Sequence, residues 1–115
     1  MKSKKNSADQ FFFSGLIRLH ILHHAVHKPF YGLWMIEELE EHGYRIGPGT
    51  LYPMLHSLEE KGYVTSFEEK SGNSIRKFYK ATSLGKKTLT EAKRKVGELN
   101  DELIEKSQHH KGEHK

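Results

Sequence analysis

Four histidines stand close together in the first third of the chain, at the spacing of one helix face. They occupy positions i, i+3, i+4 and i+7: His20, His23, His24 and His27. Imidazoles at i and i+4 can share one zinc, nickel or copper ion. No acidic residue accompanies them on this helix, and we favour the interpretation that they form a polar stripe that borders a dimer interface, tuned by pH or not. We therefore predict no resident metal or cofactor, and we keep these four as candidate metal ligands ahead of His109, His110 and His114.

The sequence lacks the residue patterns that are typical of enzyme active sites. The absence of cysteine excludes a thiol nucleophile, a zinc-thiolate finger and a disulfide framework. There is no GxSxG, HExxH or P-loop motif, because the glycine-rich run 47–50 is not followed by Gly-Lys-Ser/Thr. The carboxylates fall in solvated helical runs. The sequence thus predicts a protein that is not an enzyme.

The positive charge is concentrated in one part of the chain. The 115 residues carry a net charge of +4, yet residues 70–95 hold nine basic side chains and a single acid, Glu91, which makes this stretch +8. Such a local excess indicates a surface that faces a polyanion, although a solvated helix face beside a basic turn would look similar. The length fits one domain, and neither a membrane span nor a secretion signal is visible, so we expect a cytoplasmic protein.

Periodicity and turn residues predict the elements that must position these groups. We expect a flexible basic extension over residues 1–8, helices over 11–27 and 31–42, and a third helix from Thr50, its predicted N-cap, to about Lys61. Strands over 63–70 and 75–81 flank a turn at 71–74 and form a hairpin. Thr82 caps a long helix over 83–107, and residues 108–115 form a disordered tail.

This order of elements is that of a winged helix-turn-helix. We predict a mainly α fold with a small β-hairpin, in which residues 9–82 bind DNA and the helix over 83–107 dimerises. The third helix buries a leucine-rich stripe and turns its other face outward. The predicted DNA-binding residues lie on that face and on the hairpin: Thr50, Tyr52, Pro53, His56, Ser57, Lys70, Asn73, Arg76 and Lys77. For Tyr52, packing between the third helix and the hairpin is the alternative.

The last helix has an apolar seam with alternating steps of three and four residues, as in a coiled coil. Together with the first helix it supplies the predicted dimerisation residues: Leu16, Leu19, Leu89, Ala92, Val96, Leu99 and Leu103. Trp34 faces away from its own domain by helical spacing. It is our candidate for binding a small aromatic effector between the subunits, and the alternative is that it covers a neighbouring helix.

Four segments closely resemble the PadR family of bacterial transcriptional regulators. They are Phe30–Leu33 (FYGL), Gly47–Leu55 (GPGTLYPML), Leu58–Val64 (LEEKGYV) and Arg76–Thr82 (RKFYKAT). The resemblance covers about residues 11–103 and is that of the short subfamily with one C-terminal helix. In the second helix the family usually reads His-Gly-Tyr, whereas here Tyr31 precedes the glycine.

The resemblance implies a winged-helix dimer that represses transcription by binding a palindromic operator, and many such proteins leave DNA when a small effector binds. Two alternatives remain. One is a metal- or pH-responsive repressor that uses the histidines of the first helix. The other is a winged-helix domain that contacts proteins and does not bind DNA.

Overall fold

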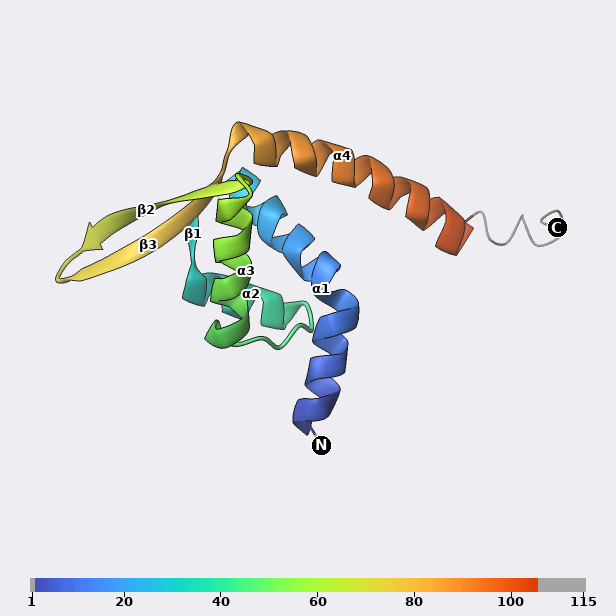
Figure 1. Ribbon diagram of the computed structural model, residues 1–115, viewed down its shortest axis with the longest axis horizontal. Coiled ribbons are helices and arrows are strands. Elements are labelled where there is room, and N and C mark those ends of the chain that lie inside the picture. The colour runs from blue at the N-terminus through green and yellow to red at the C-terminus, as the bar shows by residue number, and fades with distance from the viewer. Residues whose placement is uncertain (1, 106–115) are drawn as a thin grey trace, which may run out of the picture.

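The computed structural model describes residues 2–105, with side chains described from Gln10 to Ile104. The predicted tail at 108–115 and its histidines lie outside the described residues. The elements run in the order α1 (Lys2–His27), β1 (Phe30–Tyr31), α2 (Gly32–Glu41), α3 (Pro48–Glu60), β2 (Val64–Ser71), β3 (Ser74–Ala81) and α4 (Ser83–Asn100), followed by a π-helical segment, Asp101–Glu105 (Figure 1). The predicted class, mainly helical with a small sheet, is confirmed. No helix in this part of the chain is long and apolar enough to cross a membrane.

The core forms where α1, α2 and α3 meet. Each helix places large aliphatic side chains there, among them Ile17, Ile21, Met35, Leu39, Leu51 and Leu55, all at most 1% exposed. In α3 the buried positions Leu51, Leu55 and Leu58 follow the predicted stripe. Because this stripe fills one face of α3, the opposite face is left to solvent.

The sheet has three strands rather than the predicted two. β1 pairs antiparallel with β3 through Phe30 opposite Tyr79 and Tyr31 opposite Phe78, which gives the order β1–β3–β2. A two-residue strand has no periodicity of its own, so its sequence could not reveal it. Phe30 and Tyr79 are both buried, and this pair seals the sheet against the helices.

Two helix starts differ from the prediction. α3 begins at Pro48 with Gly47 as its N-cap, so Thr50 lies inside the first turn and is not the cap. Proline suits the first helical position because its φ is already helical and its missing N–H would be unpaired there. α1 begins at Lys2 rather than at Phe11, so the backbone of residues 2–8, predicted to be a flexible extension, belongs to this helix. No proline or glycine interrupts that stretch.

α4 leaves the domain as an arm. Its predicted cap is confirmed, because the Thr82 hydroxyl oxygen accepts from the Gly85 amide at 3.0 Å and its proton is donated to the Gly62 carbonyl at 2.6 Å. Within α4 only Gly85 and Leu89 are buried. Beyond Leu89 the helix extends away from the helices of the domain, on the side opposite to the hairpin (Figure 1).

Candidate nucleic-acid interface

The outward face of α3 gathers four of the predicted DNA-binding residues. Tyr52, Pro53, His56 and Ser57 line one shallow depression together with Glu60. Thr50 is half-buried one turn earlier. Small, polar and aromatic groups on the exposed face of one helix are what a recognition helix offers to base edges in a major groove.

Tyr52 has a second partner that the sequence did not predict. Its ring lies against the start of α2, where a Cβ on Gly32 would collide with the Tyr52 hydroxyl. The residue is 40% exposed, so one edge packs within the domain and the other faces solvent. The predicted packing alternative placed the ring between α3 and the hairpin. The observed contact is with α2, and a side chain at position 32 would require the Tyr52 ring to shift.

Glu59 fixes α3 to the sheet. Its Oε2 atom accepts hydrogen bonds from the amide of Ser66 at 3.0 Å and from its hydroxyl at 2.8 Å. Burial, followed by the nearby Glu59, raises the pKa of the Tyr79 hydroxyl, so this core tyrosine stays neutral. The carboxylate of Glu59 is thus turned inward and does not oppose an anion on the outer face of α3.

The hairpin of β2 and β3 carries the other predicted DNA-binding residues near its tip. Lys70, Asn73, Arg76 and Lys77 are all exposed. The guanidinium of Arg76 lies 4.2 Å from the centre of the Tyr31 ring, which holds it in place at the base of the sheet.

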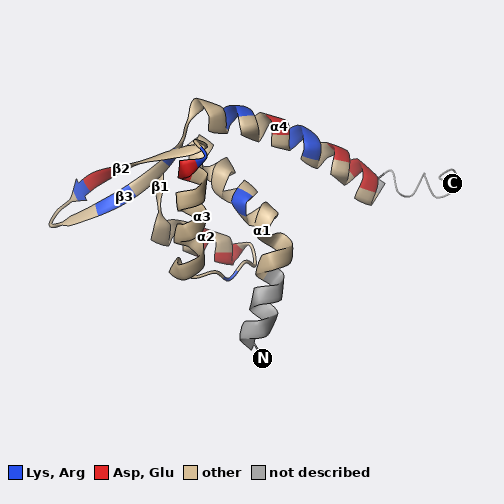
Figure 2. Ribbon diagram, viewed as in Figure 1, with Lys and Arg blue, Asp and Glu red and all other residues tan. Residues whose placement is uncertain are grey.

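The strand register also brings acids to this hairpin. Glu68 stands opposite Lys77, and Glu69 stands opposite Arg76. Red and blue therefore alternate between the two strands in Figure 2. From Val64 to Ala81, four basic side chains and two acidic ones give a net charge of +2. The net charge of +8 for residues 70–95 left out both of these acids. Two basic side chains face no acid in the register: Lys70 near the tip stands opposite Ile75, and Lys80 stands opposite Thr65.

Comparison with known proteins decides the family. The model of the transcriptional regulator PadR-like family matches residues 21–91. The chain belongs to this family. It is 44% identical over 96 residues to the transcriptional regulator Rv3488 of Mycobacterium tuberculosis, covering 84% of this chain and 90% of that protein.

Solved PadR structures share the fold. A PadR family transcriptional regulator from Eggerthella lenta superposes with a TM-score of 0.72 at 28% identity, over 87% of this chain and 88% of that one. A PadR-like transcription factor from Bacteroides fragilis gives 0.70 at 27% identity, over 83% and 93%. PadR-like proteins are DNA-binding regulators of transcription and not enzymes, which confirms the function class predicted from the sequence.

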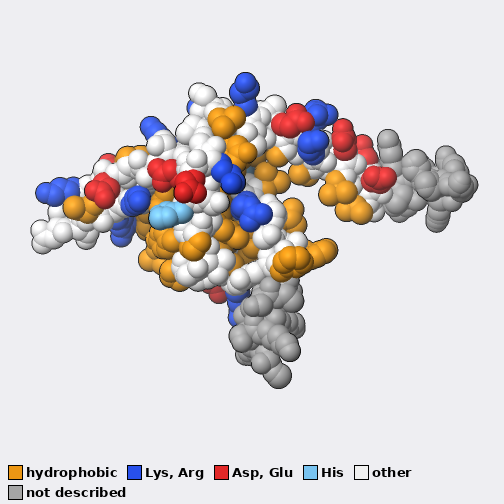
Figure 3. Space-filling model, in the orientation of Figure 1, with side chains coloured by type: hydrophobic (Ala, Val, Ile, Leu, Met, Phe, Trp, Pro, Cys, Tyr) orange, Lys and Arg blue, Asp and Glu red, His pale blue; other side chains and the backbone are white. Residues whose placement is uncertain are grey.

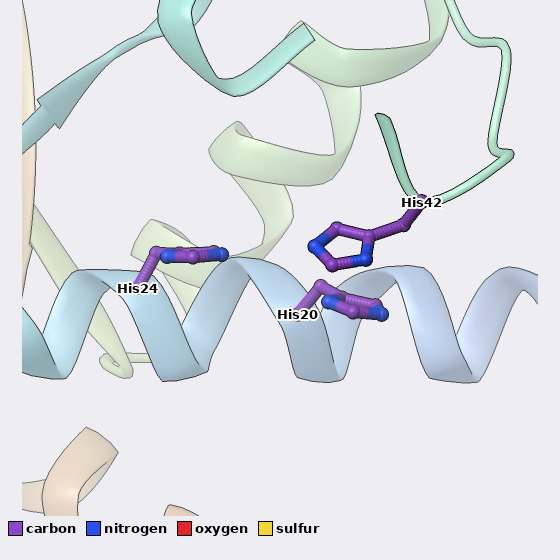
Figure 4. A group of neighbouring side chains, drawn as sticks. All are labelled: His20, His24 and His42. Carbon is purple, nitrogen blue, oxygen red and sulfur yellow. The ribbon is translucent and has the colours of Figure 1, made fainter. Parts of the chain in front are cut away.

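The four histidines that the sequence places on one face of α1 do not form a single group in the structure. His20 and His24 come together with His42, which lies at the C-terminal end of α2, and the three ligand nitrogens lie within 4.8 Å of one another (Figure 4). His23 and His27 lie against each other with their rings tilted by 45° and the ring centres 4.6 Å apart, and they are not in this group. Sequence reasoning missed His42 because it lies on another helix, eighteen residues beyond His24.

Trp34 lies in a pocket within one chain. The pocket, of about 420 Å³, is formed by the end of α1, β1, α2 and β3 and is lined by His24, His27, Lys28, Pro29, Phe30, Tyr31, Trp34 and Phe78. The indole stacks on Phe30 with ring centres 6.3 Å apart and is 37% exposed. We expected the effector site between the subunits, where the first and last helices of two copies would pack. The hollow between α1 and α4 is lined instead by Leu16, Leu19, His20, His23, Leu89 and Lys93.

The predicted dimerisation residues divide into two groups. Leu89 is 5% exposed and is already part of the core, and Leu19 and Ala92 are half-buried. Leu16, Val96, Leu99 and Leu103 are 45–65% exposed. The apolar seam therefore starts inside the domain and continues onto an open helix surface.

Proposed function

We propose that this chain is a cytoplasmic repressor that binds a palindromic operator as a homodimer and leaves it when a small effector binds. The outward face of α3 carries this proposal, because it presents Tyr52, His56 and Ser57 together beside the hairpin. An α-helix fits the major groove, and a hairpin at its flank reaches the neighbouring backbone. The inward-turned Glu59 leaves Glu60, near the end of α3, as the acid on this face.

A palindromic operator has two half-sites and therefore requires a second copy of the chain. α4 extends from the domain with Val96 and Leu99 half-exposed, and hydrophobic side chains gather on the side of α4 that faces the hollow toward α1 (Figure 3). Two copies related by a two-fold axis would cover these surfaces and would place two α3 helices on successive half-sites. PadR-like regulators are generally dimeric.

The test is a gel shift with DNA from upstream of the chain's own gene and with random DNA of equal length, at several salt concentrations. Lys77→Ala should weaken binding to both DNAs alike and flatten the salt dependence by about one unit. His56→Ala should weaken the specific complex by at least about fivefold more than the random one. Lys95→Ala, an exposed lysine on α4, is the matched control and should change neither. If the wild-type chain binds no duplex, the protein-contact alternative replaces this proposal.

The pocket beside Trp34 is the proposed effector site. Its walls are largely aromatic, its volume is that of a small-molecule site, and a planar aromatic ligand would stack on the indole. The chain has a single tryptophan, so its fluorescence reports on this pocket alone. We expect an aromatic effector to shift or quench it and to release operator DNA. Binding with full affinity in Trp34→Ala would remove the indole from the site.

A further inference from the structure

Three imidazoles from two helices converge at one point of the domain. His20 and His24 lie one turn apart on α1, and His42 reaches them from the end of α2, as Figure 4 shows. Their ligand nitrogens lie within 4.8 Å of one another. In a tetrahedral zinc site with Zn–N bonds of 2.0–2.1 Å, ligand atoms are about 3.3–3.4 Å apart. The nitrogens thus need to approach by at most about 1.5 Å. His42 is exposed at a helix end, where its ring lies 4.6 Å from that of His20, measured between ring centres.

A carboxylate stands at the required distance from two of the three imidazoles, although Glu38 is not among the ligand atoms that lie within 4.8 Å of one another. Oε2 of Glu38 lies 3.4 Å from Nε2 of His24 and 3.2 Å from Nε2 of His42. These separations equal the edges of a tetrahedron around zinc. Glu38 is one turn before His42 on α2, so each of the two helices supplies a pair of residues at i and i+4. Glu38 and His42 are the partners that α1 alone lacked.

Two of the three imidazoles are partly shielded from water. His20 and His24 are half-buried where α1 meets the end of α2, whereas His42 is exposed.

We propose that His20, His24 and His42, with Glu38 as the fourth ligand, form a binding site for one divalent transition-metal ion of the zinc class per chain. Nitrogen donors select zinc, nickel, cobalt or copper over magnesium and calcium, and four protein ligands leave no open position for catalysis. The ion would join α1 to the C-terminal end of α2. His23 and His27 remain outside the site. The proposal does not depend on DNA binding.

The experiment uses the full-length chain, freed of metal with a chelator and then titrated with zinc chloride. Calorimetry should give one zinc per chain. Because the ion binds the folded state alone, zinc at about 100 times its dissociation constant should raise the melting temperature by about 10 °C. Magnesium should do neither. Cobalt should give the intense visible absorption of a tetrahedral site.

Five variants separate this site from other histidines. His42→Ala should weaken zinc binding by more than about tenfold, and Glu38→Gln should also weaken it. His42 is exposed, so its replacement leaves the core intact. His23→Ala and His27→Ala are matched controls on α1 and should bind zinc like the wild type. A chain with His109, His110 and His114 all changed to Ala should also keep the site.

The proposal is overturned by any of three results. The first is the absence of zinc binding by the wild-type chain. The second is an unchanged affinity in His42→Ala. The third is loss of the single zinc in the tail variant or in His23→Ala, since the ion would then be held elsewhere. None of these results bears on operator binding, which the gel shift measures separately.

Discussion

Two glutamates on the apolar seam of α4 should break the proposed dimer. Val96 is 45% exposed and Leu99 is 54% exposed within one chain. Full burial of such a side chain contributes about 1.5–3 kcal/mol, so covering the exposed half contributes about 1 kcal/mol. A symmetric dimer buries two copies of each residue, which gives about 4 kcal/mol for the four side chains. Loss of this energy raises the dimer dissociation constant about 1,000-fold.

The variant is Val96→Glu with Leu99→Glu, and sedimentation velocity over a range of concentrations measures the dissociation constant. The matched control is Thr90→Glu with Arg94→Gln, two exposed positions on the opposite side of α4. Both double variants lower the net charge by two, so the control measures any effect of charge alone. It should remain as dimeric as the wild type.

Operator binding should follow the oligomer. A dimer engages two half-sites at once, so the second contact forms at a high effective concentration. The seam variant should therefore lose specific binding while its circular dichroism stays helical. A dimer of unchanged affinity in the seam variant would refute the assignment of the interface to α4. Equal dissociation of the control would show that charge, and not apolar burial, holds the copies together.

Two further changes test the contacts that shape the domain. Glu59→Gln should lower the free energy of unfolding by about 1–3 kcal/mol in urea denaturation, because the charged acceptor of both Ser66 hydrogen bonds is lost; an unchanged midpoint would contradict this role. Gly85→Ala should lower the free energy of unfolding by about 1–3 kcal/mol, because its Cβ would collide with the Tyr63 carbonyl. Gly97 has open space around it, so Gly97→Ala should stabilise α4 by about 1 kcal/mol. Equal effects of the two alanines would refute the close contact at Gly85.

The sequence was sufficient where structure depends on neighbours along the chain. Gly43 and Gly62 directly follow the predicted second and third helices, and their φ angles of +91° and +86° favour glycine. Thr82 forms its predicted cap with an amide three residues away. The buried stripe of α3 follows from its apolar spacing. Each of these features is local, so the residue types determine it directly.

Prediction from the sequence failed at one helix start and at two contacts between different elements. The start of α3 was misplaced because Thr50 is a good cap in isolation, whereas Gly47 followed by proline is used. The acids of the β2–β3 hairpin were counted separately from its bases, because the pairing of Glu68 with Lys77 depends on the register of the strands. The contact of Tyr52 with Gly32 joins two helices and leaves no periodic signal. The last two features depend on contacts between different elements of the chain, whereas the start of α3 is a local choice between two possible caps.

The position of the histidine group on α1 connects the proposed dimer with the DNA-binding face. Ile17 and Ile21 place one side of α1 in the core, while Leu16 faces outward on another side. His20 and His24 lie between these two sides, where α1 meets the end of α2. An ion there would hold α1, and with it the outward surface that a second copy would contact, at one angle to α2. Residues 42–47 join α2 to α3. In the proposed dimer, we expect an ion at this corner to change the spacing of the two recognition helices without touching either of them.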